Sequence, residues 1–334
     1  MDSSRYLPEP FVPRRGLRNG HLQTFAGNFM KRPNLLPEPE ERLFSVEPEV
    51  QVLCHCHWQP ERSQRLTVLI VHGLEGSSQS QYVLGLGYKA WQRGCNVVRM
   101  NVRNCGGTEH LGPTLYTSGL SGDLQAVIHT LIEQDNLKRI ALVGYSMGGN
   151  QVLKAMGEWS AQAPKELIGA AAVSPSADLS ACADAVHRRS NRAYEWWFVW
   201  PLRARMRRKA ELFPGRYDLT HLGRARSVRE FDDLFTAPYM GYKNAEDYYS
   251  QCSSSRVLDR IARPTLVIHA LDDPFVVLLP ETERKLRDNP SITYLRCAHG
   301  GHCAFLAAPN GYDGRWAEQQ VVNFLSCLES PAAK

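Results

Sequence analysis

Long hydrophobic runs are missing from this sequence of 334 residues. No stretch approaches the roughly 18 uninterrupted apolar residues that a membrane-spanning helix needs. The opening residues, MDSSRYLPEPFVPRRG, also lack the apolar segment of a secretory signal. Cysteine occurs nine times, an odd number without the spacing of a disulfide framework. Because disulfides form mainly in oxidising compartments, we expect reduced thiols and a cytoplasmic location.

Glycine-rich nucleotide loops are absent too. No glycine-rich segment ends in Lys followed by Ser or Thr, and no G-x-G-x-x-G opens a helix. Two clusters of Cys and His, CHCH at 54–57 and CAHGGHC at 297–303, invite a metal interpretation. Alternation along a strand places the cysteines and histidines of the first cluster on opposite faces, and the second has a better explanation below. We expect neither a cofactor nor a metal ion.

The net charge is small, but the basic residues are unevenly distributed. The formal net charge is +5, and the hydrophobic fraction of 43% is ordinary for a globular protein. Basic residues crowd into residues 188–209, RRSNRAYEWWFVWPLRARMRRK. No DNA- or RNA-reading motif accompanies them, so we predict a solvated helix face and no nucleic-acid partner. The sequence indicates no particular oligomeric state.

Strand and helix patterns alternate along most of the chain. Buried or half-buried strands are predicted at residues 49–58, 66–73, 95–101, 140–143, 167–174, 265–270 and 292–297. Helices are predicted near residues 80–93, 121–134 and 313–328 and directly after residue 146. Such alternation implies right-handed crossovers and a mostly parallel sheet with helices on both faces. The predicted fold class is α/β.

The alternation of strand and helix patterns breaks down in two segments. These breaks predict how the chain is divided into domains. Residues 1–48 are rich in proline and charge and predict an irregular N-terminal arm, although GLRNGHLQTF at 16–25 looks like the start of packed structure. Residues 178–262 offer aromatic and basic helices without a clear buried strand, as in a helical cap inserted after the sixth core strand. The core then comprises residues 49–177 and 263–334.

One serine sits between two glycines where a strand meets a helix. In RIALVGYSMGGNQVL, Gly144 and Gly148 bracket Ser146 with one residue between on each side. This spacing is typical of a nucleophile elbow, a sharp turn that strains the serine backbone and exposes its hydroxyl at the start of a helix. We therefore identify Ser146 as the candidate nucleophile.

A serine nucleophile needs a base, and that base needs a carboxylate, in the chain order Ser, Asp or Glu, His. The acid is expected in the loop after the strand TLVIHA, because the carboxyl ends of parallel strands meet at one edge of the sheet. We prefer Asp273 there. Asp272 is its rival, and Asp178 is a more distant alternative.

The base is expected in AHGGHC, after the strand ITYLRC. His302 is preferred because Gly300 and Gly301 allow the loop to bring it over the serine. His299 lies next to the strand and is expected to make a structural hydrogen bond. The predicted triad is Ser146, Asp273 and His302.

Acyl transfer also needs hydrogen-bond donors for the developing oxyanion. One donor is predicted to be the backbone N–H of Met147, directly after the nucleophile. The other is predicted to be the N–H of Leu74, in the loop after the strand LTVLIVHG. His72 in this strand is expected to shape the loop rather than to act as a base.

Several longer blocks carry a family resemblance: NGHLQT, HGLEGSSQSQY, RNCGGT, GYSMGGN, REFDDLFTAPYMGYKNAEDYYSQCSS, PTLVIHALDDPF and HGGHCAF. With these blocks the chain resembles the α/β-hydrolase superfamily, and within it the YheT-like esterases, which are related to membrane-anchored lipid hydrolases of mammals. The resemblance implies a carboxylic-ester hydrolase and places the charge-relay residues at Ser146, Asp273 and His302. The anchored relatives begin with a hydrophobic helix that this sequence does not show, so their membrane location and phospholipid substrates are not carried over.

The expected substrate is a small-molecule ester with an apolar acyl chain. The aromatic segment AYEWWFVWPLRARMRRKAELF, residues 193–213, can line an acyl pocket, pack on the core, or lie on an anionic membrane surface. Two alternative functions stay open. The same triad can transfer the acyl group to an alcohol or thiol, and a hydrolase scaffold can bind lipid without catalysis.

Overall fold

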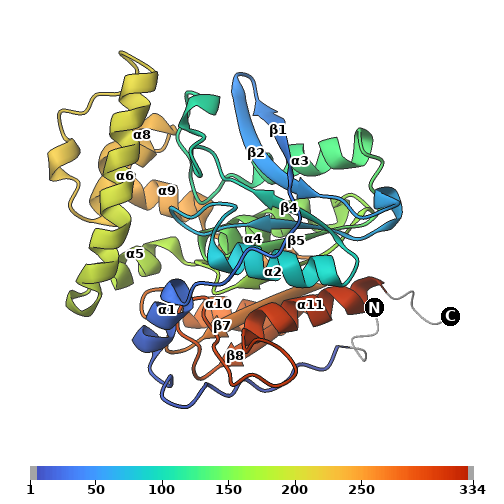
Figure 1. The fold of residues 1–334 in the computed structure, drawn as a ribbon. Coiled ribbons are helices and arrows are strands. Elements are labelled where there is room, and N and C mark those ends of the chain that lie inside the picture. The colour runs from blue at the N-terminus through green and yellow to red at the C-terminus, as the bar shows by residue number, and fades with distance from the viewer. Residues whose placement is uncertain (1–5, 330–334) are drawn as a thin grey trace.

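The computed structural model describes residues 6–329, which are built around one eight-stranded sheet (Figure 1). The strand order is β1-β2-β4-β3-β5-β6-β7-β8. Strands β3 to β8 run parallel, whereas β1 and β2 add an antiparallel edge. The strands are β1 (Glu40–Glu47), β2 (Val50–His57), β3 (Thr67–Val71), β4 (Asn96–Met100), β5 (Ile140–Tyr145), β6 (Leu167–Val173), β7 (Thr265–Ala270) and β8 (Ile292–Cys297).

Helices cover both faces of the sheet, and the sheet separates two apolar cores. On one face α2 (Gln81–Gln92) packs against α11 (Trp316–Glu329). On the other, α4 (Met147–Trp159) packs between α3 (Ser121–Glu133) and two short helical turns, Ser254–Arg256 and Leu258–Arg260, that precede β7; the second of these turns contacts α10 (Pro280–Asp288). The central strands β3 to β6 are almost wholly buried, as their β-branched and apolar runs predict. The predicted α/β fold is confirmed.

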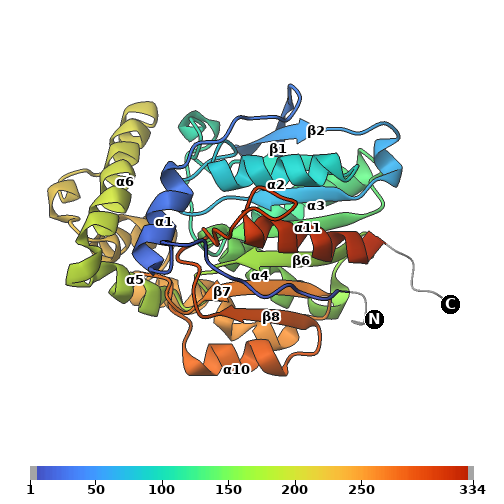
Figure 2. The ribbon, with the colours of Figure 1, turned by 60° about the horizontal axis from the view of Figure 1, so that its bottom comes forward.

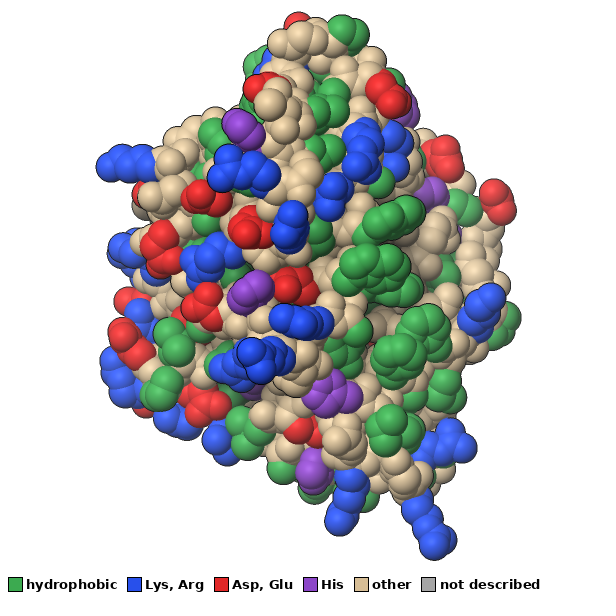
Figure 3. Space-filling view, turned by 90° about the vertical axis from the view of Figure 1, so that its left-hand side faces the viewer, with side chains coloured by type: hydrophobic (Ala, Val, Ile, Leu, Met, Phe, Trp, Pro, Cys, Tyr) green, Lys and Arg blue, Asp and Glu red, His purple; other side chains and the backbone are tan. Residues whose placement is uncertain are grey.

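Residues 178–262, which we call the cap, lie beside the carboxyl ends of the strands (Figures 1 and 2). Throughout this fully described stretch the chain forms helices and turns and no strand. The helices are α5 (Leu179–His187), α6 (Arg192–Leu212), α7 (Val228–Phe231), α8 (Ala237–Tyr239) and α9 (Ala245–Cys252), and a π-helical turn (Asp232–Thr236) joins α7 to α8. Figure 3 looks onto this side of the molecule, where hydrophobic side chains form a band.

The expected irregular arm, residues 1–48, is wrong in its second half. Residues Glu40–Glu47 form β1, which pairs antiparallel with β2 along its length. Phe44 faces the core while its neighbour Leu43 is exposed, so the strand alternates as an edge strand does. Prolines and charges around this short alternation obscured it in the sequence.

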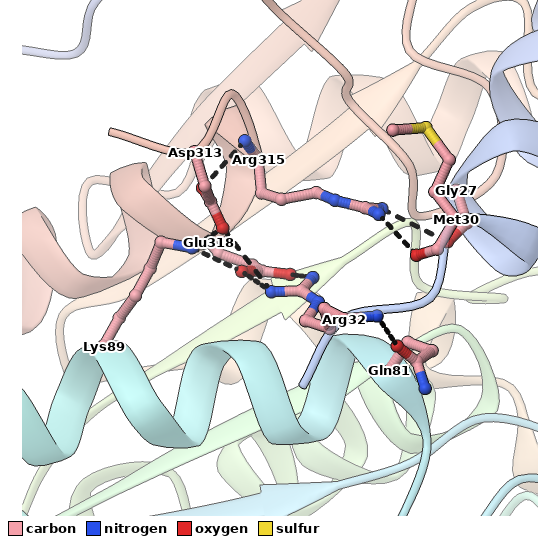
Figure 4. Close-up of polar contacts among 8 residues, drawn as sticks. All are labelled: Gly27, Met30, Arg32, Gln81, Lys89, Asp313, Arg315 and Glu318. Atoms are coloured by element: carbon pink, nitrogen blue, oxygen red, sulfur yellow. Dashed lines mark hydrogen bonds and ion pairs between the residues drawn. The ribbon is translucent and has the colours of Figure 1, made fainter. Parts of the chain in front are cut away.

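The arm also contains α1 (Gly20–Phe29), which lies between α6 and the core in both ribbon views. Two arginines hold its C-terminal end (Figure 4). Arg32 forms an ion pair with Glu318 of α11, and the Arg315 guanidinium donates hydrogen bonds of 3.1 Å each to the carbonyl oxygens of Gly27 and Met30. These carbonyls lie at the end of the helix, where backbone acceptors lack partners within the helix. The contacts fix α1 to the core.

Candidate active site

Ser146 lies at the apex of a sharp turn between β5 and α4. Its backbone has φ 54° and ψ −118°, a conformation that L-residues rarely adopt. A Cβ on Gly144 would lie 2.2 Å from the carbonyl oxygen of Gly148, and one on Gly148 would lie 2.5 Å from that of Val71. Neither position can hold a side chain without moving the backbone. The glycine spacing therefore has the steric cause expected for an elbow.

Asp273 and His302 form a hydrogen-bonded pair at the same edge of the sheet. The distance from His302 Nδ1 to Asp273 Oδ2 is 2.8 Å, and the carboxylate side chain is fully buried. The other oxygen, Oδ1, accepts hydrogen bonds from the backbone N–H groups of Phe275 and Val276 at 3.2 and 2.9 Å. These bonds fix the carboxylate so that it faces the imidazole.

The electrostatics of His302 follow from burial and from this carboxylate. Burial disfavours the imidazolium ion, but the Asp273 carboxylate and its hydrogen bond favour it, with a further contribution from Cys303, and the pKa of His302 is raised above its ordinary value. With the Nδ1 proton directed at Asp273, Nε2 of the neutral ring is left as a base.

Ser146 and His302 line one surface cleft, which we call the outer cleft. Among the described side chains no direct hydrogen bond joins the serine hydroxyl to the imidazole, and His302 Nε2 lies 3.7 Å from Cys303 Sγ. Hydrogen bonds between a nucleophile and its base are often long without substrate and shorten in the complex. The structure thus brings serine, imidazole and carboxylate to one place.

The rival acids have other partners. Asp272 accepts a hydrogen bond of 2.9 Å from the backbone N–H of Gly301 and lies 3.3 Å from His299 Nδ1. Asp178 accepts hydrogen bonds of 2.9 Å each from the N–H of Leu279 and the hydroxyl of Thr282, and so holds the start of α10. Both carboxylates serve the loops around the site rather than the imidazole of His302.

The two amides predicted for the oxyanion hole lie beside Ser146. Leu74 and Met147 line a second, deeper cavity together with this serine. In the described part of the chain, neither amide N–H donates a hydrogen bond to another protein group. Met147 also begins α4, so the positive end of the helix dipole points to the same place.

His72 holds the backbone of the loop that contains Gly73 and Leu74. The backbone N–H of Val102 donates to His72 Nε2 at 3.0 Å, so the proton is on Nδ1, which donates to the carbonyl oxygen of Gly73 at 2.7 Å. Burial lowers the pKa of His72 to about 4. A neutral, doubly bonded imidazole shapes the loop, as the sequence predicted.

The sequence missed the positioning role of α1. Thr24 is buried, and its hydroxyl accepts a hydrogen bond of 2.8 Å from the backbone N–H of His302 and donates one of 2.7 Å to Gly20 O. A Cβ on Gly301 would lie 2.5 Å from that same Gly20 oxygen. The helix therefore packs directly on the histidine loop. The block NGHLQT was the only signal for this contact.

A buried ion pair joins α6 of the cap to the loop that contains Leu74. Arg205 of α6 and Glu75, the residue after Leu74, form a bidentate ion pair with distances of 2.8 and 3.2 Å. The hydroxyl of Tyr116 donates to the same carboxylate at 2.5 Å. Glu75 has φ 55°, so these bonds hold a strained backbone next to Leu74.

The deeper cavity runs from Ser146 between the core and the cap. Most of its lining is apolar and comes from α5, α6 and the loops over the sheet, including Leu115, Met147, Leu179, Ala183, Val186, Leu202 and Met206. Arg205, Asp232 and Tyr248 are among the polar residues that line it. The site thus combines the polar edge that holds Ser146, Asp273 and His302 with an apolar compartment.

Comparison with known proteins identifies the family of this chain. Residues 67–309 match the family model described as alpha/beta hydrolase fold. The chain belongs to this family. This α/β-hydrolase is 33% identical over 320 residues to a protein of Escherichia coli (strain K12) named "Putative esterase YheT", with 95% of this chain and 93% of that protein covered.

More distant relatives include the mouse protein named "Phospholipase ABHD3", at 29% identity over 260 residues. This match covers 78% of the α/β-hydrolase described here and 61% of the mouse protein. Among solved structures, Pyrococcus furiosus esterase Pf2001 superposes with a TM-score of 0.58 at 18% identity, covering 99% of this chain and 100% of that one. The latter likeness shows the fold alone.

The predicted family is therefore confirmed, and the relatives' names agree with the predicted class of ester-hydrolysing enzymes. Within residues 6–329, no helix combines the length and apolar character needed to cross a bilayer. The cytoplasmic location stays a prediction.

Proposed function

We propose that this α/β-hydrolase cleaves carboxylic esters through an acyl-enzyme intermediate, with Ser146 as nucleophile, His302 as base and Asp273 as the group that orients the imidazole. One observation carries the proposal. His302, which is joined to the buried Asp273 at 2.8 Å, lines the same cleft as Ser146, a serine held at φ 54° on an elbow that only glycines permit.

The reaction follows from these positions. Ser146 Oγ attacks the ester carbonyl carbon while its proton moves to His302 Nε2. The N–H groups of Leu74 and Met147 stabilise the oxyanion, and each such donor contributes about 2.7 to 4 kcal/mol in comparable sites. The alcohol leaves with the proton from His302. Water then attacks the acyl-enzyme by the same route and releases the acid.

The apolar lining of the deeper cavity supports a substrate that carries an apolar acyl group. It begins at Ser146, and its walls are mainly leucine, valine, methionine and aromatic side chains. Burying each CH₂ of an acyl chain there stabilises the bound ester by roughly 0.8 kcal/mol. We therefore propose that medium-chain esters are hydrolysed with higher kcat/KM than acetyl esters.

Hydrolysis of p-nitrophenyl esters tests the proposal. Ser146→Ala is expected to lower kcat about 10⁶-fold and to abolish labelling by a fluorophosphonate probe. Ser176→Ala is the matched control, because Ser176 lines the same cavity but lies outside the glycine-bracketed elbow. Equal activity in Ser146→Ala and wild type would refute the assignment.

The same assay separates the two alternatives. A protein that binds lipid without catalysis would show neither turnover nor labelling of Ser146. An acyltransferase would form the acyl-enzyme but release more transesterified product than free acid when an alcohol is added at fixed ester concentration.

A further inference from the structure

The outer cleft opens through a surface with many exposed apolar side chains, which we call the aromatic patch. Its members are Leu22, Phe25, Phe29 and Met30 of α1 and the residue after it, and Trp196, Trp197 and Trp200 of α6. Their exposed fractions range from 43% to 66%. Every Phe and Trp side chain exposed to this degree within residues 6–329 belongs to the patch.

Ring contacts make the patch continuous across the two helices. The rings of Phe25 and Phe29 stack at 4.7 Å, and Phe29 meets Trp197 of α6 edge-on at 5.9 Å. On α6, Trp196 and Trp200 are four residues apart and therefore share one side of the helix. Figure 3 shows the band of hydrophobic side chains on this face. A contiguous exposed apolar surface of this kind marks an interaction site.

The patch is continuous with the catalytic cleft. Phe25, Phe29, Trp196 and Trp197 line the outer cleft together with Ser146 and His302. Whatever covers the patch therefore also covers the entrance to the site. A water-soluble protein bound there would obstruct the entry of an ester, whereas a lipid surface would deliver it.

The charge around the patch points to an anionic surface. Residues 11–37, which contain α1, include four arginines and one lysine but no Asp or Glu. Residues 188–208 contain one carboxylate, Glu195, which is buried and lies 3.0 Å from His187. Exposed basic residues beside the patch include Arg18, Lys31, Arg189 and Arg192. Basic groups next to Trp and Phe are typical of helices that lie on anionic bilayers.

We propose that the aromatic patch docks on the surface of an anionic lipid bilayer, so that the outer cleft opens directly onto lipid. This inference extends the proposed function by naming how the ester is presented, although docking itself needs no chemistry. Because α1 is fixed to the core by Arg32 and Arg315 and contacts the His302 loop through Thr24, docking of α1 also orients the catalytic edge towards the lipid.

Vesicle co-sedimentation tests the docking without catalysis. Full-length protein carrying Ser146→Ala is mixed with vesicles of phosphatidylcholine and phosphatidylglycerol in a molar ratio of about 7:3. Adding Leu22→Ser and Trp200→Ser is expected to lower the partition coefficient at least about tenfold. These side chains belong to the patch, are 54% and 63% exposed, and do not line the outer cleft. Leu43→Ser, on an edge strand and 51% exposed, is the matched control and is expected to bind normally.

Charge variants test the electrostatic part. Arg18→Gln and Lys31→Gln are each expected to lower binding to the anionic vesicles about fivefold and to leave binding to pure phosphatidylcholine unchanged. Arg256→Gln and Arg260→Gln remove exposed charges outside both segments and serve as controls. Equal thermal unfolding midpoints establish that all variants are folded.

The inference is overturned if the parent protein does not bind anionic vesicles, or if the patch variant binds as well as the Leu43 control. It is also overturned if the protein is a dimer in light scattering that the patch variant converts to monomers, because the patch is then a contact between copies. Absence of vesicle binding with retained Ser146-dependent hydrolysis of soluble esters refutes the docking alone. Vesicle binding by a protein that hydrolyses no ester refutes the proposed function alone.

Discussion

Replacing Ser146 by glycine should stabilise the protein relative to replacing it by alanine, because the elbow backbone is strained. A residue with a Cβ at φ 54° and ψ −118° costs about 1 to 3 kcal/mol in the folded state, and glycine avoids most of that cost. Glycine also loses about 0.5 to 1 kcal/mol more backbone entropy on folding than alanine. The net expectation is that Ser146→Gly is more stable than Ser146→Ala by about 1 kcal/mol.

The comparison isolates backbone strain because both variants lack the hydroxyl. They also keep the backbone hydrogen bonds of the elbow, from Ser146 N to Val173 O at 2.9 Å and from Asn150 N to Ser146 O at 3.0 Å. For a chain of this length, about 1 kcal/mol raises the thermal unfolding midpoint by about 1 to 2 °C. Both variants should be inactive.

The matched control is the same pair of substitutions at Ser176, which lies outside the positive-φ residues. There the glycine variant should unfold at a lower temperature than the alanine variant, so the sign is opposite. If Ser146→Gly unfolds at or below the midpoint of Ser146→Ala, the strain assigned to the Ser146 backbone is refuted.

Three further predictions concern the site. Thr24→Val removes the acceptor for the His302 backbone N–H and should lower kcat about 10- to 100-fold with little change in KM. Thr24→Ser keeps a hydroxyl acceptor and should retain most of the activity. An equal loss in both variants would contradict the positioning role of Thr24. Asp273→Asn should lower kcat about 10³- to 10⁴-fold, and Asp272→Asn should change kcat much less. Burial lowers the pKa of His302, but the Asp273 carboxylate raises it by more, so the pKa lies above its ordinary value. Because the base must be neutral, the acid limb of the kcat/KM–pH profile should move to lower pH in Asp273→Asn. An unmoved acid limb would contradict the pairing of Asp273 with His302. Ala183→Phe fills part of the deeper cavity, so kcat/KM for octanoyl esters should fall at least about tenfold relative to acetyl esters, and an unchanged ratio would place the acyl chain elsewhere.

Features that depend on neighbouring residues were predictable from the sequence. The elbow is one, because a strand run, two glycines and a helical pattern lie within fifteen residues. The steric cause of Gly144 is local, whereas that of Gly148 is the carbonyl oxygen of Val71 on the neighbouring strand β3. The parallel sheet is another, since buried strands alternate with amphipathic helices. The order of the loops after the strands then limited the acid to Asp273, Asp272 or, more distantly, Asp178, and the base to His299 or His302.

The short edge strand β1 shows where local patterns fail. Its alternation covers only Glu40–Glu47, and prolines and charges surround it. Its identity as a strand depends on pairing with β2, which the residues of β1 do not encode by themselves. The predicted arm was therefore too long.

By itself, the sequence determined the fold class, the elbow and the set of candidate catalytic groups, because short-range sterics and hydrophobic periodicity act within one element or one turn. Only the tertiary structure decided which carboxylate meets which imidazole, that Thr24 holds the histidine loop across 278 residues of sequence, and that two distant helices place their aromatic side chains around one cleft. Those outcomes depend on hydrogen bonds and packing between segments that become neighbours only after the sheet has formed.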